Sequence, residues 1–179
     1  YSGSIVRSTG VDNRALTRYA RDSGTVAFSS SIPGDDTIFI NGDTGGGTVR
    51  LTADNTSSGE WHIEAGTLSF TDGGSMDNTV RVGPDGVATP ASLIFASDGV
   101  VALAQEVVIR AGGATRTVGS SGGAGCLHML TGKLSLDNNV TLSAVAGTLN
   151  FNLLEDGLGA EDPASAAQER GGGGGRFPG

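Results

Sequence analysis

The sequence predicts an all-β chain whose short strands stack, coil upon coil, into a right-handed parallel β-solenoid. Between residues 25 and 151, quartets with two apolar positions one residue apart recur, a pattern typical of half-buried strands. The hexapeptide Ala-Gly-Thr-Leu-Ser-Phe at 65–70 returns as Ala-Gly-Thr-Leu-Asn-Phe at 146–151. Glycine, 31 of 179 residues, separates the quartets and so marks turns.

The quartets give the expected strands and the expected core. The strands are predicted at 25–28, 37–40, 48–51, 60–63, 67–70, 79–82, 92–95, 100–103, 106–109, 127–130, 133–136, 140–142 and 148–151. Their alternation predicts an inward set of Val49, Leu51, Trp61, Ile63, Leu68, Phe70, Val80, Val82, Leu134, Leu136, Leu149 and Phe151. Asp-Gly pairs at 72–73, 85–86 and 98–99 indicate turns between strands.

The spacing of the quartets favours stacked coils. Coils of about 20 to 25 residues would place each strand over its counterpart one turn later. On that spacing the return of the hexapeptide equals about four coils, and residues 25–151 make about six. An antiparallel β-sandwich is the competing interpretation, because its strands also recur at short and regular intervals.

The two ends differ from the middle, which divides the chain into a cap at 1–24, a solenoid at 25–151 and a Gly-rich tail or linker at 152–179. Residues 11–23 carry Leu16, Tyr19 and Ala20 at helical spacing after a possible N-cap at Asp12, which predicts a short capping helix. Such a helix would cover the open edge of the first coil.

Opposite charges at the two ends suggest head-to-tail assembly. Residues 1–23 carry a net charge of +2, and residues 152–179 carry −3. A heterologous contact between such ends would propagate into a filament. The expected assembly contacts are Arg7, Arg14, Arg18, Arg21, Glu155, Asp156, Glu161 and Asp162.

Composition argues against several functional classes. The net charge is −8 and no basic face is apparent, so nucleic acid is not an expected partner. No apolar run approaches the roughly 18 residues of a membrane span, so membrane insertion is not expected. Cys126 is the single cysteine, which leaves no disulfide framework and no cysteine-based metal site. No cofactor is expected.

Few residues point to catalysis, and the chain is not expected to be an enzyme. Glu60, His62 and Glu64 alternate on one strand, but successive members about 6.8 Å apart favour a solvated polar face over a metal site. His128 is expected at the surface, between inward Leu127 and Met129. Ice binding, which would need ranked Thr-x-Thr rows, is disfavoured, since Thr48, Thr67, Thr79 and Thr148 open their strands singly.

Residues 47–70 resemble the autotransporter-associated β-strand repeat. Val49 and Leu51 match its first strand, Asn55-Thr56 and Gly59 its polar turn, Ile63 its second strand, and residues 65–68 its closing Ala-Gly-Thr-Leu. Residues 132–151 match in part, with a shortened turn. The resemblance implies a right-handed parallel β-helix on secreted bacterial surface proteins, without catalytic residues of its own.

The expected function is therefore that of an extracellular or cell-surface structural or adhesive module. It would self-associate, with a filament subunit as one form, and surface glycans are possible partners. The alternatives are a carbohydrate-binding or polysaccharide-degrading β-helix, and a viral fibre domain.

Overall fold

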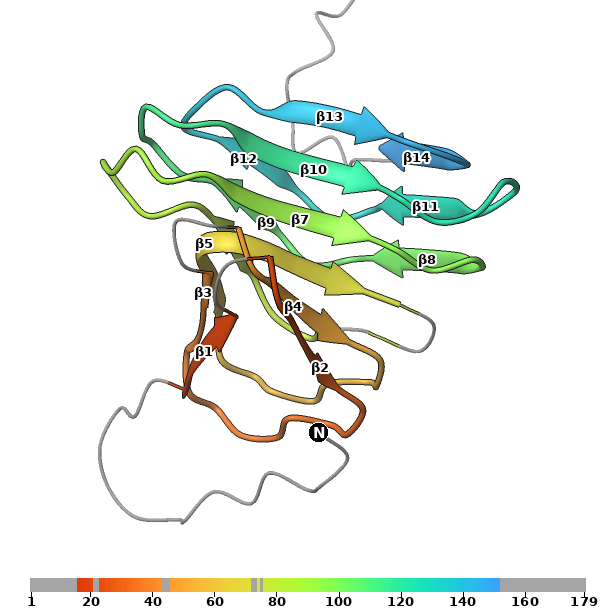
Figure 1. The fold of residues 1–179 in the computed structure, drawn as a ribbon, viewed down its shortest axis with the longest axis horizontal. Helices are drawn as coiled ribbons and strands as arrows, with labels where there is room; N and C mark the ends of the chain where they lie inside the picture. Colours follow the sequence, from red (N-terminus) through yellow and green to blue (C-terminus); the bar gives the residue numbers. More distant parts are fainter. Residues whose placement is uncertain (1–15, 21–22, 43–45, 72–73, 75, 152–179) are drawn as a thin grey trace, which may run out of the picture.

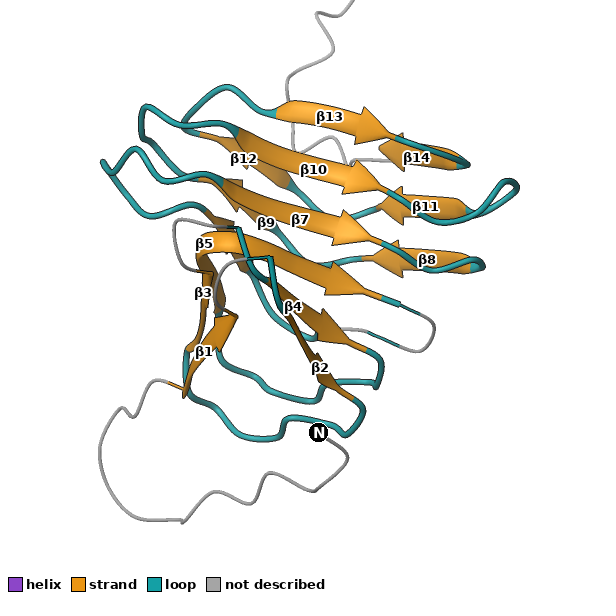
Figure 2. Cartoon of the chain, viewed as in Figure 1, coloured by secondary structure: helices purple, strands orange, loops and turns teal. Residues whose placement is uncertain are grey.

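The computed structural model is a β-solenoid of about five turns built from parallel strands (Figure 1). It describes residues 16–20, 23–42, 46–71, 74 and 76–151, and the regular elements in these ranges are all strands (Figure 2). The predicted all-β solenoid is confirmed. The strand pairs between coils are parallel, so the antiparallel sandwich is wrong.

The strands form three sheets that run along the solenoid axis. The first sheet contains β1 (Leu16–Ala20), β3 (Ile38–Gly42), the first half of β5 (Trp61–Phe70), β6 (Val80–Val82), β9 (Val107–Ile109) and β12 (Leu134–Leu136). The second contains β2 (Thr25–Phe28), β4 (Thr48–Leu51), the second half of β5, β7 (Ala91–Phe95), β10 (Arg116–Ser120) and β13 (Thr141–Ala144). The third contains β8 (Val100–Leu103), β11 (Leu127–Leu130) and β14 (Thr148–Phe151).

The two copies of the hexapeptide do not lie over one another, contrary to the prediction. Thr67 pairs with Ser92 on the second sheet, whereas Thr148 pairs with Leu127 on the third. The coils also vary in length, since the coil from Trp61 to its partner Val80 is shorter than the one from Val80 to Val107. The separation of the two copies is therefore not a whole number of coils.

What the two copies share is a corner. Gly66 has φ +74° where β5 passes from the first sheet to the second, and Gly147 has φ +71° between β13 and β14. Positive φ costs little only for glycine, so each Ala-Gly-Thr turns the chain before a new alternating strand. At Gly147 a Cβ atom would also lie 2.1 Å from the sulfur of Cys126. The motif encodes a bend, which the solenoid uses at two different corners.

The core consists of columns of inward side chains that run through successive coils. One column contains Val26, Val49, Leu68, Leu93, Val118 and Leu142. Another contains Ile40, Ile63, Val82, Ile109 and Leu136. Side chains in the middle of these columns are fully buried, and the rings of Phe70 and Phe95 stack at 5.9 Å in a third column.

The predicted inward set is confirmed as far as Val82 and only in part beyond it. Leu134, Leu149 and Phe151 are half-buried against the core, and Leu136 is exposed. All four continue core columns, but they lie on the last described coil, where no described strand covers them.

The predicted N-terminal helix is wrong where it can be checked. Residues 16–20 form strand β1, which pairs in parallel with β3. The helical spacing of Leu16, Tyr19 and Ala20 is short enough to occur by chance in a strand, and pairing with a neighbouring coil outweighs so weak a local preference. The rest of the predicted cap and the Gly-rich tail lie outside the described residues.

We expect Leu68→Ala to lower the free energy of unfolding by about 2 to 5 kcal/mol, because it opens a cavity in a fully buried column. Urea denaturation followed by circular dichroism measures this. Val100→Ala, at a side chain 68 % exposed, is the control and should change stability by less than about 0.5 kcal/mol. Equal effects of the two substitutions would contradict the assignment of Leu68 to the core.

Candidate functional site

The outer face of the first sheet holds the predicted trio of Glu60, His62 and Glu64. The structure brings them together: His62 Nε2 lies 2.9 Å from a carboxylate oxygen of Glu60, and His62 Nδ1 lies 3.6 Å from one of Glu64. Within the described ranges, no three His, Cys, Asp or Glu side chains form a group that could hold a metal ion. The trio belongs instead to a ladder of ion pairs.

Arg81, one coil further along, neutralises Glu60. It pairs in register with His62, and its guanidinium donates two hydrogen bonds to the Glu60 carboxylate, at 2.9 and 2.8 Å. These bonds, followed by the hydrogen bond from His62, lower the pKa of Glu60 from 4.5 to about 2. The same pairing raises the pKa of Arg81. The carboxylate is thus a structural anion and a poor general acid or base near neutral pH.

Further pairs extend this ladder over the next coils. Arg110 lies 3.3 Å from Glu64 and 3.9 Å from Asp85. Glu106 accepts a hydrogen bond from Ser135 at 2.6 Å and lies 3.7 Å from Lys133. Consecutive coils are therefore linked by charge as well as by backbone bonds, and each described carboxylate of the ladder faces a cation.

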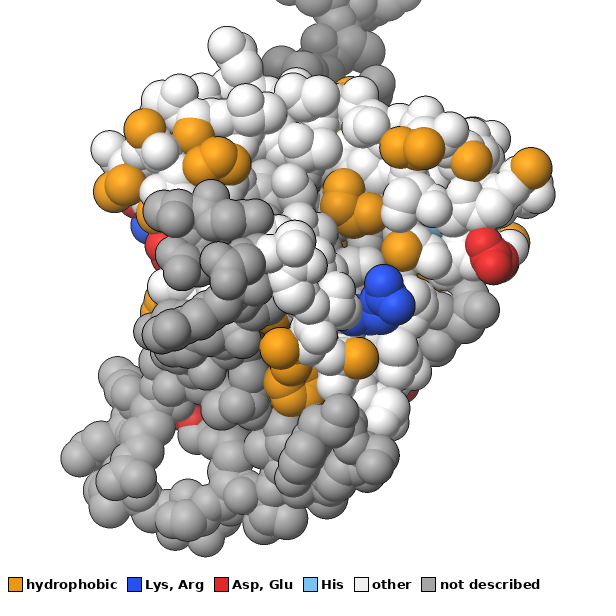
Figure 3. All heavy atoms as spheres, in the orientation of Figure 1, with side chains coloured by type: hydrophobic (Ala, Val, Ile, Leu, Met, Phe, Trp, Pro, Cys, Tyr) orange, Lys and Arg blue, Asp and Glu red, His pale blue; other side chains and the backbone are white. Residues whose placement is uncertain are grey.

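The outer face of the second sheet carries a row of hydroxyl groups, with the exposed Arg50 beside it on β4. The register places one hydroxyl-bearing residue on each of six successive strands: Thr25, Thr48, Thr67, Ser92, Thr117 and Thr141. Neighbouring members are one strand spacing apart, about 4.8 Å. Figure 3 views the side on which β7, β10 and β13 lie, where white side chains and backbone are interrupted by hydrophobic patches and one cationic group.

This row corrects part of the sequence analysis. Thr48 and Thr67 do stack, and Ser92 and Thr117 continue the row. The row could not be recognised within any one strand, because each strand contributes a single member. The row is one residue wide, because the positions two residues further along the strands hold unlike side chains such as Arg50 and Ile94. Paired Thr-x-Thr rows are absent from the described sheets.

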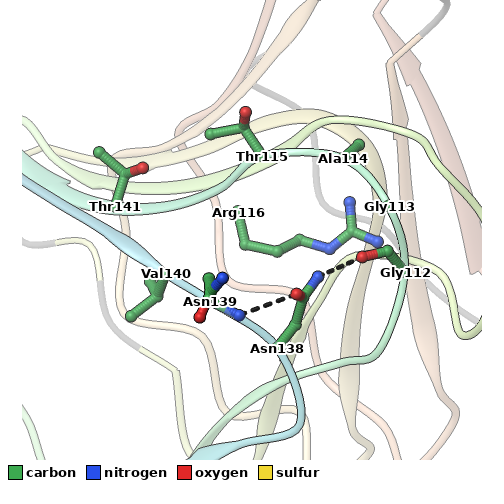
Figure 4. Close-up of a pocket in the computed structure, with 9 residues that line it drawn as sticks. All are labelled: Gly112, Gly113, Ala114, Thr115, Arg116, Asn138, Asn139, Val140 and Thr141. Atoms are coloured by element: carbon green, nitrogen blue, oxygen red, sulfur yellow. Dashed lines mark hydrogen bonds between the residues drawn. The ribbon is translucent and has the colours of Figure 1, made fainter.

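A pocket of about 330 Å³ opens where the loops before β10 and β13 run side by side (Figure 4). Its walls are residues 112–116 and 138–141. The Asn138 side chain ties the two loops together, since its amide donates to the Gly112 carbonyl and its oxygen accepts from the Asn139 backbone. Thr141 belongs both to this pocket and to the hydroxyl row.

Arg116 is the charged residue of the pocket wall, and it is fully buried. Its guanidinium donates to three backbone carbonyls, those of Pro84, Val87 and Thr89. Its Nε atom is buried without a hydrogen-bond acceptor among the described residues. Desolvation, followed by the nearby charge of Arg110, lowers the pKa of Arg116. No described carboxylate forms an ion pair with it.

His128 is buried, so its predicted surface position is wrong. In β11 the inward residues are His128 and Leu130, which continue columns from Val101 and Leu103 of β8. Ser97 O can only accept, so the His128 Nε2–H donates to it at 3.0 Å. Nδ1 then accepts from the Ser120 hydroxyl at 2.7 Å.

The serine–histidine pair does not constitute a catalytic dyad. Ser120, His128 and the neighbouring Cys126 are each at most 2 % exposed, so a substrate could not reach the hydroxyl or the thiol. The ring of His128 also packs against Phe95, with centroids 5.6 Å apart. The pair therefore satisfies polar groups inside the core.

The other predicted site residues lie outside the described side chains. Of the eight expected assembly contacts, Arg18 alone falls on described backbone, in β1, where it pairs in register with Ile40. Trp61 is buried, as predicted. No helix among the described residues is long and apolar enough to cross a membrane.

No family model, curated protein or solved structure matches this chain.

We expect the contribution of Glu60 to stability to disappear in acid. Because its folded pKa is lowered, the contribution is fully present above the unfolded value near 4.5 and is lost as the pH falls through about 2. Glu60→Gln should therefore cost about 0.5 to 1 kcal/mol at pH 6, the range of a partly exposed pair, and almost nothing below about pH 2. Urea melts of both proteins across this range measure the difference. Asp77→Asn, an exposed carboxylate without a described ion pair, is the control.

We expect Ser120→Ala to destabilise the fold by about 1 to 3 kcal/mol, because it leaves Nδ1 of the buried His128 without a donor. Ser143→Ala, at an outward position of β13, should have little effect. Urea denaturation at neutral pH compares the two. Indistinguishable midpoints would mean that the Ser120–His128 bond does not hold the core.

Proposed function

We propose that this chain is a structural module of an extracellular or cell-surface protein, a rigid right-handed β-solenoid that lengthens by stacking a second copy on its last coil. Parallel crossover connections are almost always right-handed, which supports that winding. Coils that add at one end extend both the hydrogen-bond ladders and the core columns.

The end of the core columns carries this proposal. Leu136, Leu142 and Val145 on the last described coil are 56, 52 and 78 % exposed. Leu136 and Leu142 occupy inward positions, so they are core residues with no further layer among the described residues. Strands β12, β13 and β14 each pair with one described strand only, so their outer edges have no partner among the described residues. Open edges with apolar side chains favour further strand pairing.

A second copy fits this end because the two ends of the stack present different strands. One end presents β12, β13 and β14, and the other presents β1 and β2 (Figure 1). β12 and β1 belong to the first sheet, and β13 and β2 to the second, so a translated copy would continue both sheets. The net charges of +2 over residues 1–23 and −3 over residues 152–179 favour the same head-to-tail order.

The likeness of residues 47–70 to the autotransporter-associated repeat supports an extracellular setting and an adhesive role. A carbohydrate-binding module is the second candidate, favoured by the hydroxyl row on the second sheet. A polysaccharide-degrading β-helix and a viral fibre domain remain further alternatives, but no described cluster supplies paired, accessible carboxylates with a raised pKa for hydrolysis.

We expect the full chain to form filaments that lengthen with concentration and shorten with added salt. A Leu142→Lys, Val145→Lys double variant should remain monomeric, because buried lysines would oppose each stacked contact. Negative-stain electron microscopy and sedimentation velocity measure assembly. Val87→Lys, at an exposed loop position 53 % accessible, is the matched control and should still assemble.

Two results would overturn this proposal. One is a wild-type chain that stays monomeric at all concentrations. The other is slow hydrogen exchange of the backbone amides of β12, β13 and β14 in the monomer. That result would mean that residues 152–179 of the same chain already cover these strand edges.

A further inference from the structure

We propose that Asn139 is an acceptor site for N-linked glycosylation, which joins a sugar to the side-chain amide nitrogen of asparagine. The acceptor signal, the sequon, is Asn-x-Ser or Asn-x-Thr, where x is any residue but proline. It occurs twice in the sequence, at residues 55–57 and 139–141. The inference goes beyond stacking, and it rests on the extracellular setting proposed above, because secreted chains are the ones that commonly carry this modification.

The structure excludes the sequon at residues 55–57. Asn55 is 1 % exposed, and its side chain accepts from the Ile32 backbone at 3.1 Å and donates to the Ala53 carbonyl at 2.7 Å. Ser57 is equally buried, and its hydroxyl accepts from the Gly59 backbone. A transferase could reach neither the amide nor the hydroxyl in the folded chain, and an attached sugar would have to displace closely packed atoms.

The sequon at residues 139–141 presents both of its functional groups to solvent. Val140 packs against the core, whereas its neighbours Asn139 and Thr141 are exposed. Because alternate residues of an extended chain point to the same side, the acceptor amide and the hydroxyl that the transferase recognises lie together on the outside. The backbone N–H of Asn139 donates to the Asn138 side chain, and the Asn139 side chain itself has no hydrogen bond among the described residues.

The surroundings of Asn139 leave room for a sugar. Its side chain lies at the wall of the pocket between residues 112–116 and 138–141, which has a volume of about 330 Å³ (Figure 4). Thr115 and Thr141 are exposed at the same wall, so their hydroxyl groups are available to hydrogen-bond with those of a sugar. Asn139 also precedes β13, so a bulky group there interrupts no described strand pairing.

The transfer is a substitution at the sugar carbon, and its co-reactant is a diphosphate-activated sugar. The amide nitrogen of Asn139 forms a bond to the anomeric carbon as the bond from that carbon to the phosphate oxygen breaks. The diphosphate leaves with the electron pair, and the amide loses one proton. The product is uncharged at the side chain and carries the bulk of the sugar on the surface of the solenoid.

Enzymatic transfer to the folded, full-length chain tests the site. The probes are a soluble asparagine glucosyltransferase and uridine diphosphate glucose, and mass spectrometry of the intact and then the proteolysed chain locates the added hexose. Unfolded peptides of residues 50–60 and 134–144 are the controls for the enzyme, and both should be modified. We expect the folded chain to gain a hexose at Asn139 and to remain unmodified at Asn55.

Two substitutions at one position separate recognition of the sequon from simple exposure. Thr141→Ser keeps the hydroxyl and should still accept glucose, whereas Thr141→Val keeps the branched shape and should lower the rate of transfer about tenfold or more. Asn139→Gln should abolish transfer. Modification of Asn55 in the folded chain, equal rates for the two Thr141 variants, or an unmodified folded chain would each overturn the proposal. None of these results bears on stacking, which electron microscopy measures separately.

Discussion

The parallel register between successive coils is the constraint on which the rest of this structure depends. It places like positions over one another in each coil, although the sequence between them varies in length and content. Given that register, an apolar residue at an inward position becomes part of a column, and a polar residue at an outward position becomes part of a row. The core, the ion-pair ladder and the hydroxyl row all follow from this arrangement.

The fold class could be predicted because alternation within a quartet is local and strong. The columns over Val49 to Val82 required only that each quartet have one buried face. The position of a strand around the coil was harder to predict, as the hexapeptide illustrates. Its glycine fixes a local bend with positive φ, and that bend is equally useful at either corner. Similar sequence therefore indicated similar conformation and not the same sheet.

Elements of the site were harder to predict because they depend on which distant residues the register brings together. The Leu-His-Met-Leu quartet at 127–130 offers two alternations, and only the column above Val101 decides that His128 faces inward. Glu60 and His62 were recognised as an outward pair, but their cation, Arg81, comes from the next coil. The charge of Arg116 is unusual only because it is buried, which sequence alone does not reveal.

The outer face of the first sheet, the last described coil and the region beside the second sheet differ in which groups lack a partner. On the first sheet, cations and carboxylates compensate one another, so that face has little electrostatic attraction left for a ligand. The last described coil leaves apolar columns and strand edges without a described partner. A further coil of the same kind would bury these side chains and pair with these edges. Beside the second sheet, the buried cation of Arg116 is held by backbone carbonyls and is out of reach of solvent. The end of the described stack is therefore where the register leaves the most apolar surface and backbone without a described partner.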